Sequence, residues 1–222
     1  MYKYVKRGID LVMAVLLLII FLIPMLIIAV LIKLDSKGPV LFKQKRTGLK
    51  GKVFNLYKFR SMVTDNDVHD FSKGDQHTKV GNIIRKTSLD ELPQIINIIK
   101  GEMSFIGPRP WITDYYDNMS EKQRHRNDVL PGITGLAQAK GRNNISINEK
   151  INYDLEYVKN YSFRQDVKIV FLTIKTVLSK EGADAGKNTI QNELEDLKTQ
   201  NLSLDDIREA QEDNSDKVIY SH

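Results

Sequence analysis

The chain has 222 residues, which is enough for one compact domain with attached segments and too few for two ordinary enzyme domains. It contains no cysteine, which excludes a disulfide framework, a thiolate metal site and a cysteine nucleophile. The net charge is +5, but residues 191–222 are acidic, so the rest of the chain is strongly basic and suits anionic lipid, phosphorylated small molecules or nucleic acid.

The first predicted element is a membrane segment. Residues 11–32 contain no charged side chain, and about 20 apolar residues suffice to cross the hydrocarbon core of a bilayer. A cleavable signal peptide would have a shorter apolar region, of roughly 7–15 residues, followed by a small-residue cleavage site, which is not found after Ile32. We therefore expect this segment to lie in inner-membrane lipid, and we expect no nucleic acid as partner.

Pro24 indicates how the membrane segment is arranged. Lysine and arginine are retained on the cytoplasmic side of membranes, yet they flank this segment on both sides, within residues 3–7 and within residues 33–60. Pro24 lies near the middle and breaks the helical hydrogen-bond ladder. We therefore predict a re-entrant helix that bends at Pro24 and returns to the cytoplasmic face. A kinked helix that crosses the membrane is the alternative.

The following elements predict a small domain. Residues 40–62 have the pattern of a β-hairpin, and residues 64–82 that of a polar loop. A helix is expected to begin near residues 88–90, with an apolar stripe that extends to Met103. Further helices are expected over residues 120–128, 148–159 and 166–179. The last is amphipathic and suits either the membrane interface or the core.

The predicted fold class is α+β, mostly helical with a small β-hairpin, and embedded in the membrane through the N-terminal re-entrant helix. We divide the chain into the membrane helix with its flanks at 1–37, a catalytic domain at the cytoplasmic face at 38–190, and an acidic, weakly structured tail at 191–222. No chemistry is placed in the tail.

Asp90 and Glu91 are the strongest candidates for catalysis. Ser88 and Glu91 have the spacing of a capping box, so both acids can be explained as residues of a helix start. In the functional interpretation, one carboxylate attacks phosphorus and its neighbour helps to hold Mg²⁺, because transfer from a diphosphate requires a nucleophile and neutralisation of charge. The two interpretations can hold for one site.

Basic residues at three other places are candidates for phosphate binding. Arg109 lies between two prolines, which fix the backbone beside its guanidinium. Lys58 and Arg60 would share one face of a strand, and Arg142 ends a glycine-rich stretch that begins at Gly132. Each pattern alone also fits an ordinary surface turn, hairpin face or loop. His77 and His125 have no spacing partner and are assigned no role.

Several motifs in order resemble the small monotopic bacterial polyprenyl-phosphate phosphoglycosyl transferases, the initiating sugar transferase family. Beside the apolar segment broken by Pro24, they are KFRSM at 58–62, SLDEL at 88–92, GEMSFIGPRP at 101–110 and PGITG at 131–135. The resemblance covers about residues 1–180. It implies an enzyme that transfers a sugar-1-phosphate from a UDP-sugar to polyprenyl (undecaprenyl) phosphate and releases UMP, at the cytoplasmic face of the bacterial plasma membrane.

The resemblance also implies roles for particular residues. Asp90 would be the nucleophile that forms a covalent phosphosugar intermediate, and Glu91 would bind Mg²⁺ together with Asp90. Arg85 and Arg109 would hold the phosphates. The product would enter assembly of a glycan such as a capsule, and a second copy of the chain or downstream glycosyltransferases are left open as protein partners.

The chain departs from the family pattern at three positions, which are Leu136 in place of a frequent tryptophan, Lys140 in place of an asparagine and Ile23 in place of a serine before Pro24. The first places a stacking contact with the sugar in doubt, and the last makes the bend less certain.

Two interpretations of other classes stay open. Asp65 and Asp67 are similar to the two-aspartate metal motif of nucleotide-sugar glycosyltransferases, which would release UDP and need no Asp90 nucleophile. A membrane-anchored assembly module without catalytic activity would instead use the acidic tail to bind its partner.

Overall fold

The computed structural model describes residues 1–63, 76–141, 145–179 and 192–199. Over these residues the chain is mostly helical with short strands, as predicted. It divides into two packed units. Unit 1 comprises Met1–Gly48 and Val53–Phe105, and unit 2 comprises Leu49–Lys52 and the described part of Ile106–His222. The predicted boundaries at residues 37 and 190 separate a membrane segment, a domain and a tail, whereas the two units are divided by packing. These boundaries therefore stay a prediction.

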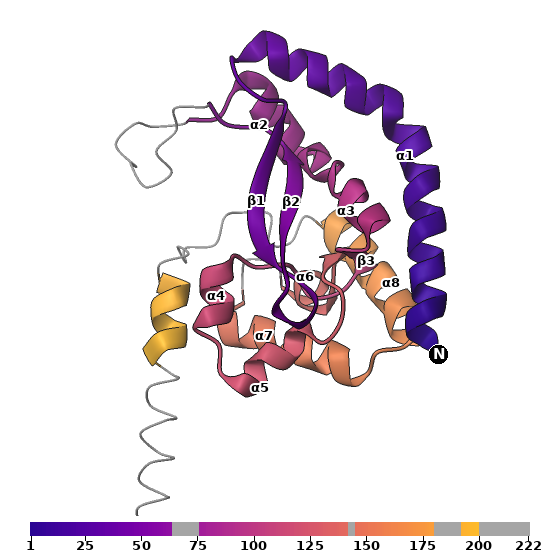
Figure 1. Ribbon diagram of the computed structural model, residues 1–222, viewed down its shortest axis with the longest axis vertical. Helices are drawn as coiled ribbons and strands as arrows, with labels where there is room; N and C mark the ends of the chain where they lie inside the picture. Colours follow the sequence, from indigo (N-terminus) through magenta and orange to yellow (C-terminus); the bar gives the residue numbers. More distant parts are fainter. Residues whose placement is uncertain (64–75, 142–144, 180–191, 200–222) are drawn as a thin grey trace, which may run out of the picture. The chain divides into compact units, whose positions relative to one another are not determined.

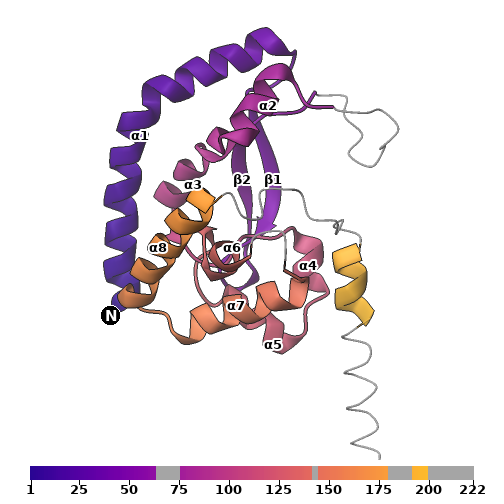
Figure 2. The same ribbon diagram turned by 180° about the vertical axis from the view of Figure 1, so that it is seen from behind.

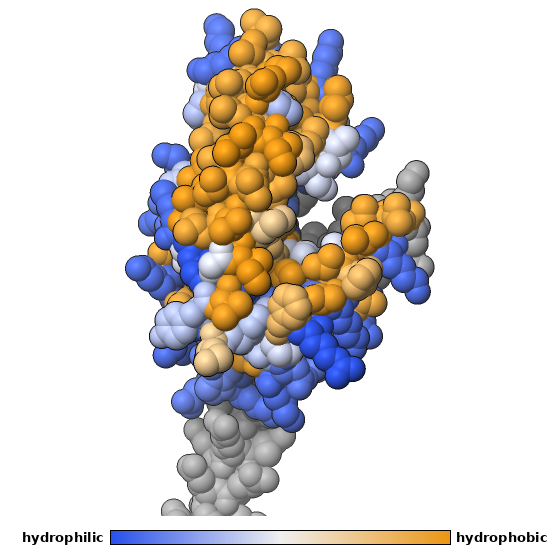
Figure 3. Space-filling view, turned by 90° about the vertical axis from the view of Figure 1, so that its right-hand side faces the viewer, coloured by the Kyte–Doolittle hydropathy of each residue, from blue (hydrophilic) through white to orange (hydrophobic). Residues whose placement is uncertain are grey.

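Unit 1 begins with the helix α1, Tyr2–Asp35, which contains Pro24 and has 34 residues. A straight helix of this length would be about 50 Å long. Figure 1 instead shows two arms that meet at a bend. Most apolar side chains of α1 are exposed, and Figure 3 shows them as a nearly continuous band along the helix. By length and composition α1 could cross a membrane, and only 11% of its most apolar stretch of 18 residues is buried.

The first turns of α1 are bound to a later part of unit 1. Arg7 donates hydrogen bonds to the carbonyl oxygens of Ile98 and Ile99, at 2.6 and 2.9 Å. These carbonyls belong to the last turn of a later helix, whose negative dipole end favours a cation. Asp10 is 3% exposed, and its Oδ1 accepts from the backbone N–H of Phe105.

The other end of α1 is bound to the same unit. Oδ2 of Asp35 accepts from the backbone N–H of Val80 at 2.8 Å. The Arg60 guanidinium donates to the carbonyl oxygens of Lys37 and Ser36, at 2.9 and 2.7 Å. A buried apolar cluster beneath these contacts contains Ile28, Ile32, Phe59 and Ile84. Both ends of α1 are therefore attached to one packed unit.

A β-hairpin and two short helices complete unit 1. The strands β1, Leu41–Thr47, and β2, Val53–Phe59, pair antiparallel, which confirms the predicted hairpin. The helix α2, Lys79–Lys86, overlaps the end of the segment that was expected to be a polar loop. That expectation is wrong for residues 79–82, because Thr78 caps the helix by accepting from the N–H of Gly81. The unit ends with α3, Gln94–Lys100, and with β3, Ser104–Ile106, which extends into unit 2.

The predicted helix start at residue 88 is different in the structure. Ser88 has a φ of 57°, in the left-handed region, and its side chain makes no capping hydrogen bond. Leu89–Glu91 form a single 3₁₀ turn, η3, and α3 begins only after Pro93. The capping-box explanation of the paired acids is therefore wrong, and these acids lie on a tight turn between α2 and α3.

Unit 2 is helical around a central short helix. The predicted helices at 120–128, 148–159 and 166–179 are confirmed as α5 with η4, α7 and α8. Figure 2 shows α6 beside α7 and α8, against which it packs. The elements are η1 (Leu49–Gly51), α4 (Thr113–Asp117), α5 (Glu121–Arg124), η4 (His125–Asn127), β4 (Gly132–Thr134), α6 (Leu136–Lys140), α7 (Ile147–Lys159), α8 (Phe163–Ser179) and a helix at 192–199.

Helix α8 is amphipathic and leaves most of its apolar stripe exposed. Ile169 is buried, whereas the exposed side chains are Phe163, Val167, Val170, Phe171, Ile174, Val177 and Leu178. Of the two interpretations given for this helix, packing against the core holds for Ile169, whereas most of the stripe remains exposed among the described residues. Its place at a membrane interface stays a prediction.

The tail differs from its description as weakly structured over residues 192–199. These residues form a helix, and Leu197 is 0% exposed in a cluster with residues of unit 2. The prediction followed from acidic composition, which does not reveal that two leucines lie on one helix face. The other tail residues lie outside the described ranges.

Candidate active site

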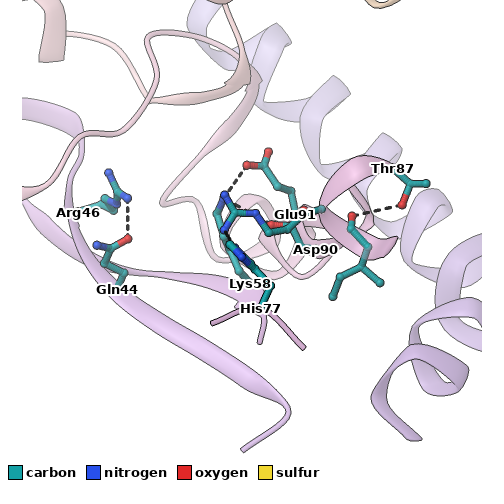
Figure 4. Close-up of polar contacts among 9 residues, drawn as sticks. Gln44, Arg46, Lys58, His77, Thr87, Asp90 and Glu91 are labelled. Atoms are coloured by element: carbon teal, nitrogen blue, oxygen red, sulfur yellow. Dashed lines mark hydrogen bonds and ion pairs between the residues drawn. The ribbon is translucent and has the colours of Figure 1, made fainter. Parts of the chain in front are cut away.

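The paired acids of unit 1 meet a lysine from the β-hairpin. Nζ of Lys58 lies 2.6 Å from Oε1 of Glu91 and 3.9 Å from Oδ2 of Asp90. Figure 4 shows the lysine reaching from β2 toward the η3 turn. The side chains of Lys58, Asp90 and Glu91 are 21%, 13% and 20% exposed. The site is therefore shielded but open to a ligand from solvent.

The local backbone explains why these acids point outward. Ser88 turns the chain after α2, and η3 is closed by hydrogen bonds from Glu91 N to Ser88 O and from Leu92 N to Leu89 O. Leu89 and Leu92 pack on the apolar cluster of unit 1. Since the leucines face inward on this turn, Asp90 and Glu91 are presented on its other side.

The environment of Asp90 changes its proton affinity. Burial raises the pKa of the Asp90 carboxyl above its usual value, and the Lys58 ammonium opposes this rise. The Glu91 carboxylate raises the pKa of Asp90 further, whereas Arg85 lowers it. A carboxylate that is poorly solvated and lies beside a cation has the properties of a candidate functional group.

Arg85 and His77 lie at the same site. Nη1 of Arg85 donates to Nε2 of His77, so this imidazole nitrogen acts as acceptor. The structure therefore brings together Lys58, Arg85, Asp90 and Glu91 among the predicted residues. It adds His77, which has no spacing partner in the sequence and was assigned no role.

Arg60 is placed differently from the expectation of a substrate ligand. It is 5% exposed, and its guanidinium is bound to Ser36 and Lys37 at the end of α1. Strand alternation placed Arg60 on one face with Lys58, but β2 ends at Phe59, and the pattern could not reveal which segment the guanidinium contacts. In the described contacts Arg60 fixes the end of α1.

In unit 2, the motif around Arg109 packs on the glycine-rich loop. Gly107 N donates to Thr134 O, and Gly132 N donates to Pro108 O, both at 2.9 Å. A Cβ atom added to Gly107 would overlap the carbonyl oxygen of Leu130. The glycines thus permit a close approach between two segments of the chain itself. The Arg109 side chain is exposed at this junction.

A buried ion pair supports the Arg109 segment and was not predicted. Arg126 donates to Oδ2 of Asp154 at 2.7 Å and to the carbonyl oxygen of Arg109 at 2.8 Å. The side chains of Arg126 and Asp154 are each 2% exposed, and the Arg126 guanidinium lies 3.9 Å from the ring centroid of Trp111. Burial raises the pKa of Asp154, and Arg126 opposes that rise. Neither residue lies in a recognisable motif.

The structure describes only some of the remaining candidate residues. Arg142, Asp65 and Asp67 lie outside the described residues. Leu136 is 1% exposed at the start of α6, so it presents no surface on which a sugar could stack. Arg109 and the cluster of Asp90 belong to different units.

The carboxylates of Asp90 and Glu91 suit a hard cation that takes few of its ligands from the protein. Among the described residues no group of three or more metal-binding side chains occurs. Mg²⁺ is often bound through one or two carboxylates together with substrate phosphates and water. Two neighbouring carboxylates therefore suit Mg²⁺ that arrives with a phosphorylated substrate.

Comparison with known proteins identifies a family. The model of the family described as bacterial sugar transferase matches residues 1–180. The chain is 46% identical to the uncharacterized sugar transferase EpsL of Bacillus subtilis (strain 168), with 80% of this chain and 89% of EpsL covered.

The names of two further relatives state an activity. The chain is 44% identical to the UDP-N-acetylgalactosamine-undecaprenyl-phosphate N-acetylgalactosaminephosphotransferase of Aeromonas hydrophila, covering 82% of this chain and 45% of the relative. It is also 44% identical to the UDP-glucose:undecaprenyl-phosphate glucose-1-phosphate transferase of Escherichia coli (strain K12), covering 78% and 40%. The chain spans less than half the length of these two relatives.

Proposed function

The chain belongs to the bacterial sugar transferase family, and we propose that it transfers a sugar-1-phosphate from a UDP-sugar to undecaprenyl phosphate. The observation that carries this proposal is the cluster of Lys58, Asp90 and Glu91, which joins a shielded carboxylate, a second carboxylate and a cation. The activities for which the Aeromonas and Escherichia relatives are named support the substrate classes.

In the proposed first step, a carboxylate oxygen of Asp90 attacks the phosphorus that carries the sugar. The bond from that phosphorus to the oxygen bridging the two phosphates breaks, UMP leaves, and a phosphosugar ester of Asp90 remains. Poor solvation of the Asp90 carboxylate favours the attack, because less water has to be displaced from the nucleophile. Lys58 and Arg85 neutralise the negative charge that gathers around this phosphorus.

In the proposed second step, an oxygen of undecaprenyl phosphate attacks the same phosphorus. The bond to Asp90 breaks, and the free carboxylate is restored with the lipid diphosphate sugar as product. No oxidant, reductant or further reactant is needed. Glu91, which lies 2.6 Å from Lys58, keeps the cation beside Asp90.

Asp90 and Glu91 are the residues that would hold Mg²⁺, which when bound would neutralise charge on the diphosphate. The magnesium requirement belongs to the proposal. It is supported by the fit of two neighbouring carboxylates to an ion that takes its other ligands from phosphate and water.

We also propose that α1 is re-entrant and keeps the site at the cytoplasmic face. Arg7 and Asp10 at one end, and Asp35 at the other, are bound to the same unit. A helix that crossed the bilayer would carry its two ends to opposite faces, where one unit could not hold both. The bend of α1 and its exposed apolar side chains support the same arrangement.

The test is nucleotide release by purified protein in detergent, with a panel of UDP-sugars, Mg²⁺ and undecaprenyl phosphate. The natural sequence should release UMP, and Asp90→Asn should release none above background. Asp117→Asn, at an exposed aspartate of unit 2, is the matched control and should retain activity. Release of UDP that persists in Asp90→Asn would overturn the mechanism and favour glycosyl transfer.

A further inference from the structure

The helix at 192–199 is docked on unit 2. Leu197 is 0% exposed and belongs to a buried cluster, against which the partly buried Leu194 also packs. The buried members of the cluster are Trp111, Tyr115, Met119, Ile147, Ile151 and Leu197. Leu194 and Leu197 are three residues apart and so share one helix face. The segment therefore contributes core residues to unit 2, although it lies far along the sequence from the other members of the cluster.

A specific polar contact fixes the docked helix. Oε1 of Glu193 lies 2.6 Å from Nζ of Lys150, and Oε2 of Glu193 accepts from the Tyr115 hydroxyl at 2.7 Å. The side chains of Lys150 and Glu193 are 18% and 14% exposed, so this ion pair is shielded from solvent. Both carboxylate oxygens are thus occupied, and the contact defines the register of the helix on α4 and α7.

The docked helix and the Arg109 segment share a core. Trp111 follows Arg109 after one proline and packs in the same cluster as Leu197. The Arg126 guanidinium stacks on the Trp111 ring at 3.9 Å and donates to the carbonyl oxygen of Arg109 at 2.8 Å. Packed contacts therefore run from Leu197 through Trp111 and Arg126 to the Arg109 backbone.

We propose that residues 192–199 act as a C-terminal strap that positions Arg109 for phosphate binding. The proposal rests on the proposed function and on the role that the family resemblance implies for Arg109, which is to hold a phosphate of the UDP-sugar. Loss of the strap removes Leu194, Leu197 and Glu193 from the core, so Trp111 and the Arg109 backbone lose part of their support. Arg109 keeps its charge but not its position.

The chain provides its own reporter for this proposal, because Trp111 is its single tryptophan. A chain ending at residue 191 removes the strap, and a chain ending at residue 199 keeps it and serves as control. The shorter chain should show red-shifted Trp111 emission and greater quenching by acrylamide than the natural sequence. The longer truncated chain should resemble the natural sequence in both.

Kinetics test the positioning role. The chain ending at residue 191 should have a KM for the UDP-sugar raised by about tenfold or more, with a smaller change in kcat, because misplacement of a binding group by about 1 Å has large effects. Glu193→Gln should change KM in the same direction, whereas Glu195→Gln, at an exposed position of the same helix, should not. Combining Lys150→Glu with Glu193→Lys should restore KM toward the natural value.

The results of these experiments distinguish the docking of the strap, the positioning of Arg109 and the proposed function. Unchanged Trp111 emission in the chain ending at residue 191 would overturn the docking. Changed emission with unchanged KM in that chain and in Glu193→Gln would overturn the positioning of Arg109. If the natural sequence releases no UMP with any UDP-sugar, the proposed function fails, and emission still decides whether the strap is docked.

Discussion

Lys58 is bound to Glu91 at 2.6 Å and only lies near Asp90, at 3.9 Å. This asymmetry assigns different work to the two acids. In the proposed mechanism, Glu91 holds the Lys58 cation and Asp90 keeps its oxygen atoms available for attack. Since a positioned cation stabilises charge that develops in the transition state, removal of Lys58 should lower kcat more than it raises KM.

We therefore expect Lys58→Ala to lower kcat by about 10²–10³-fold, a typical cost for loss of one electrostatic group at a reacting centre. Lys58→Arg should retain more activity, because it keeps the charge. Lys45→Ala, at an exposed lysine of β1, is the control and should stay near the natural rate. UMP release under saturating UDP-sugar measures the effect, and an unchanged kcat in Lys58→Ala would remove the lysine from the mechanism.

The raised pKa of Asp90 predicts a pH-dependent gain in stability for Asp90→Asn. Because the folded pKa is raised, the folded chain binds the proton of Asp90 more tightly than the unfolded chain does, and stability falls as pH rises through the folded value. Above that value the natural sequence carries the cost of a poorly solvated carboxylate. Asp90→Asn should then raise Tm at neutral pH.

The same gain should shrink at acidic pH, where Asp90 is protonated in both states. Thermal unfolding of both proteins in detergent at several pH values measures this difference. A lower Tm for Asp90→Asn at neutral pH would mean that Lys58 and Arg85 stabilise the carboxylate more than burial penalises it.

The sequence predicted the elements whose pattern is local. The hairpin at 40–62, the helix α7 and the helix α8 follow from alternation and helical spacing, and the structure confirms them. The pair of Asp90 and Glu91 was also identified as a candidate from the sequence, but the backbone conformation at these residues was not predicted. The spacing of Ser88 and Glu91 suits a capping box, whereas packing of Leu89 and Leu92 on the apolar cluster selects a 3₁₀ turn.

Contacts between distant segments could not be predicted. Arg60 binds the end of α1, Arg7 binds the end of α3, and Arg126 pairs with Asp154. Each of these arginines is only a positive charge in the sequence, and the partner is set by tertiary packing. The docking of residues 192–199 was missed for the same reason, since acidic composition masks two well-placed leucines.

The buried pair of Arg126 and Asp154 predicts a large stability effect. Asp154→Ala leaves the Arg126 guanidinium buried without its carboxylate, which typically costs about 3–5 kcal/mol. Denaturant unfolding followed by Trp111 emission measures the loss, because Arg126 stacks on that ring. Asp117→Ala, at an exposed aspartate, is the control. A cost below about 1 kcal/mol would mean that the pair adds little beyond a surface salt bridge.

Gly107 and Gly8 form a matched pair for the close approach in unit 2. A Cβ at Gly107 would overlap the backbone of Leu130, whereas a Cβ at Gly8 meets nothing within 4 Å. Gly107→Ala should therefore destabilise the fold by about 1–3 kcal/mol or more. Gly8→Ala lies within α1 and should be neutral or stabilising by up to about 1 kcal/mol. Equal Tm values for the two variants would contradict this packing.

The arrangement of α1 can be tested because the natural chain has no cysteine. Tyr4→Cys and Lys37→Cys each place a single thiol at an exposed position near one end of α1, and Ile20→Cys places one within its apolar part. If α1 is re-entrant, a membrane-impermeant maleimide should label both end positions in inverted membrane vesicles and neither in intact spheroplasts. Ile20→Cys should resist labelling in both preparations, because a thiol within the hydrocarbon core is not reached by the reagent.

Labelling of the two ends from opposite sides would establish a crossing helix. In that case the attachments of Arg7 and Asp35 to one unit could not both exist in the membrane, and the re-entrant arrangement would be overturned.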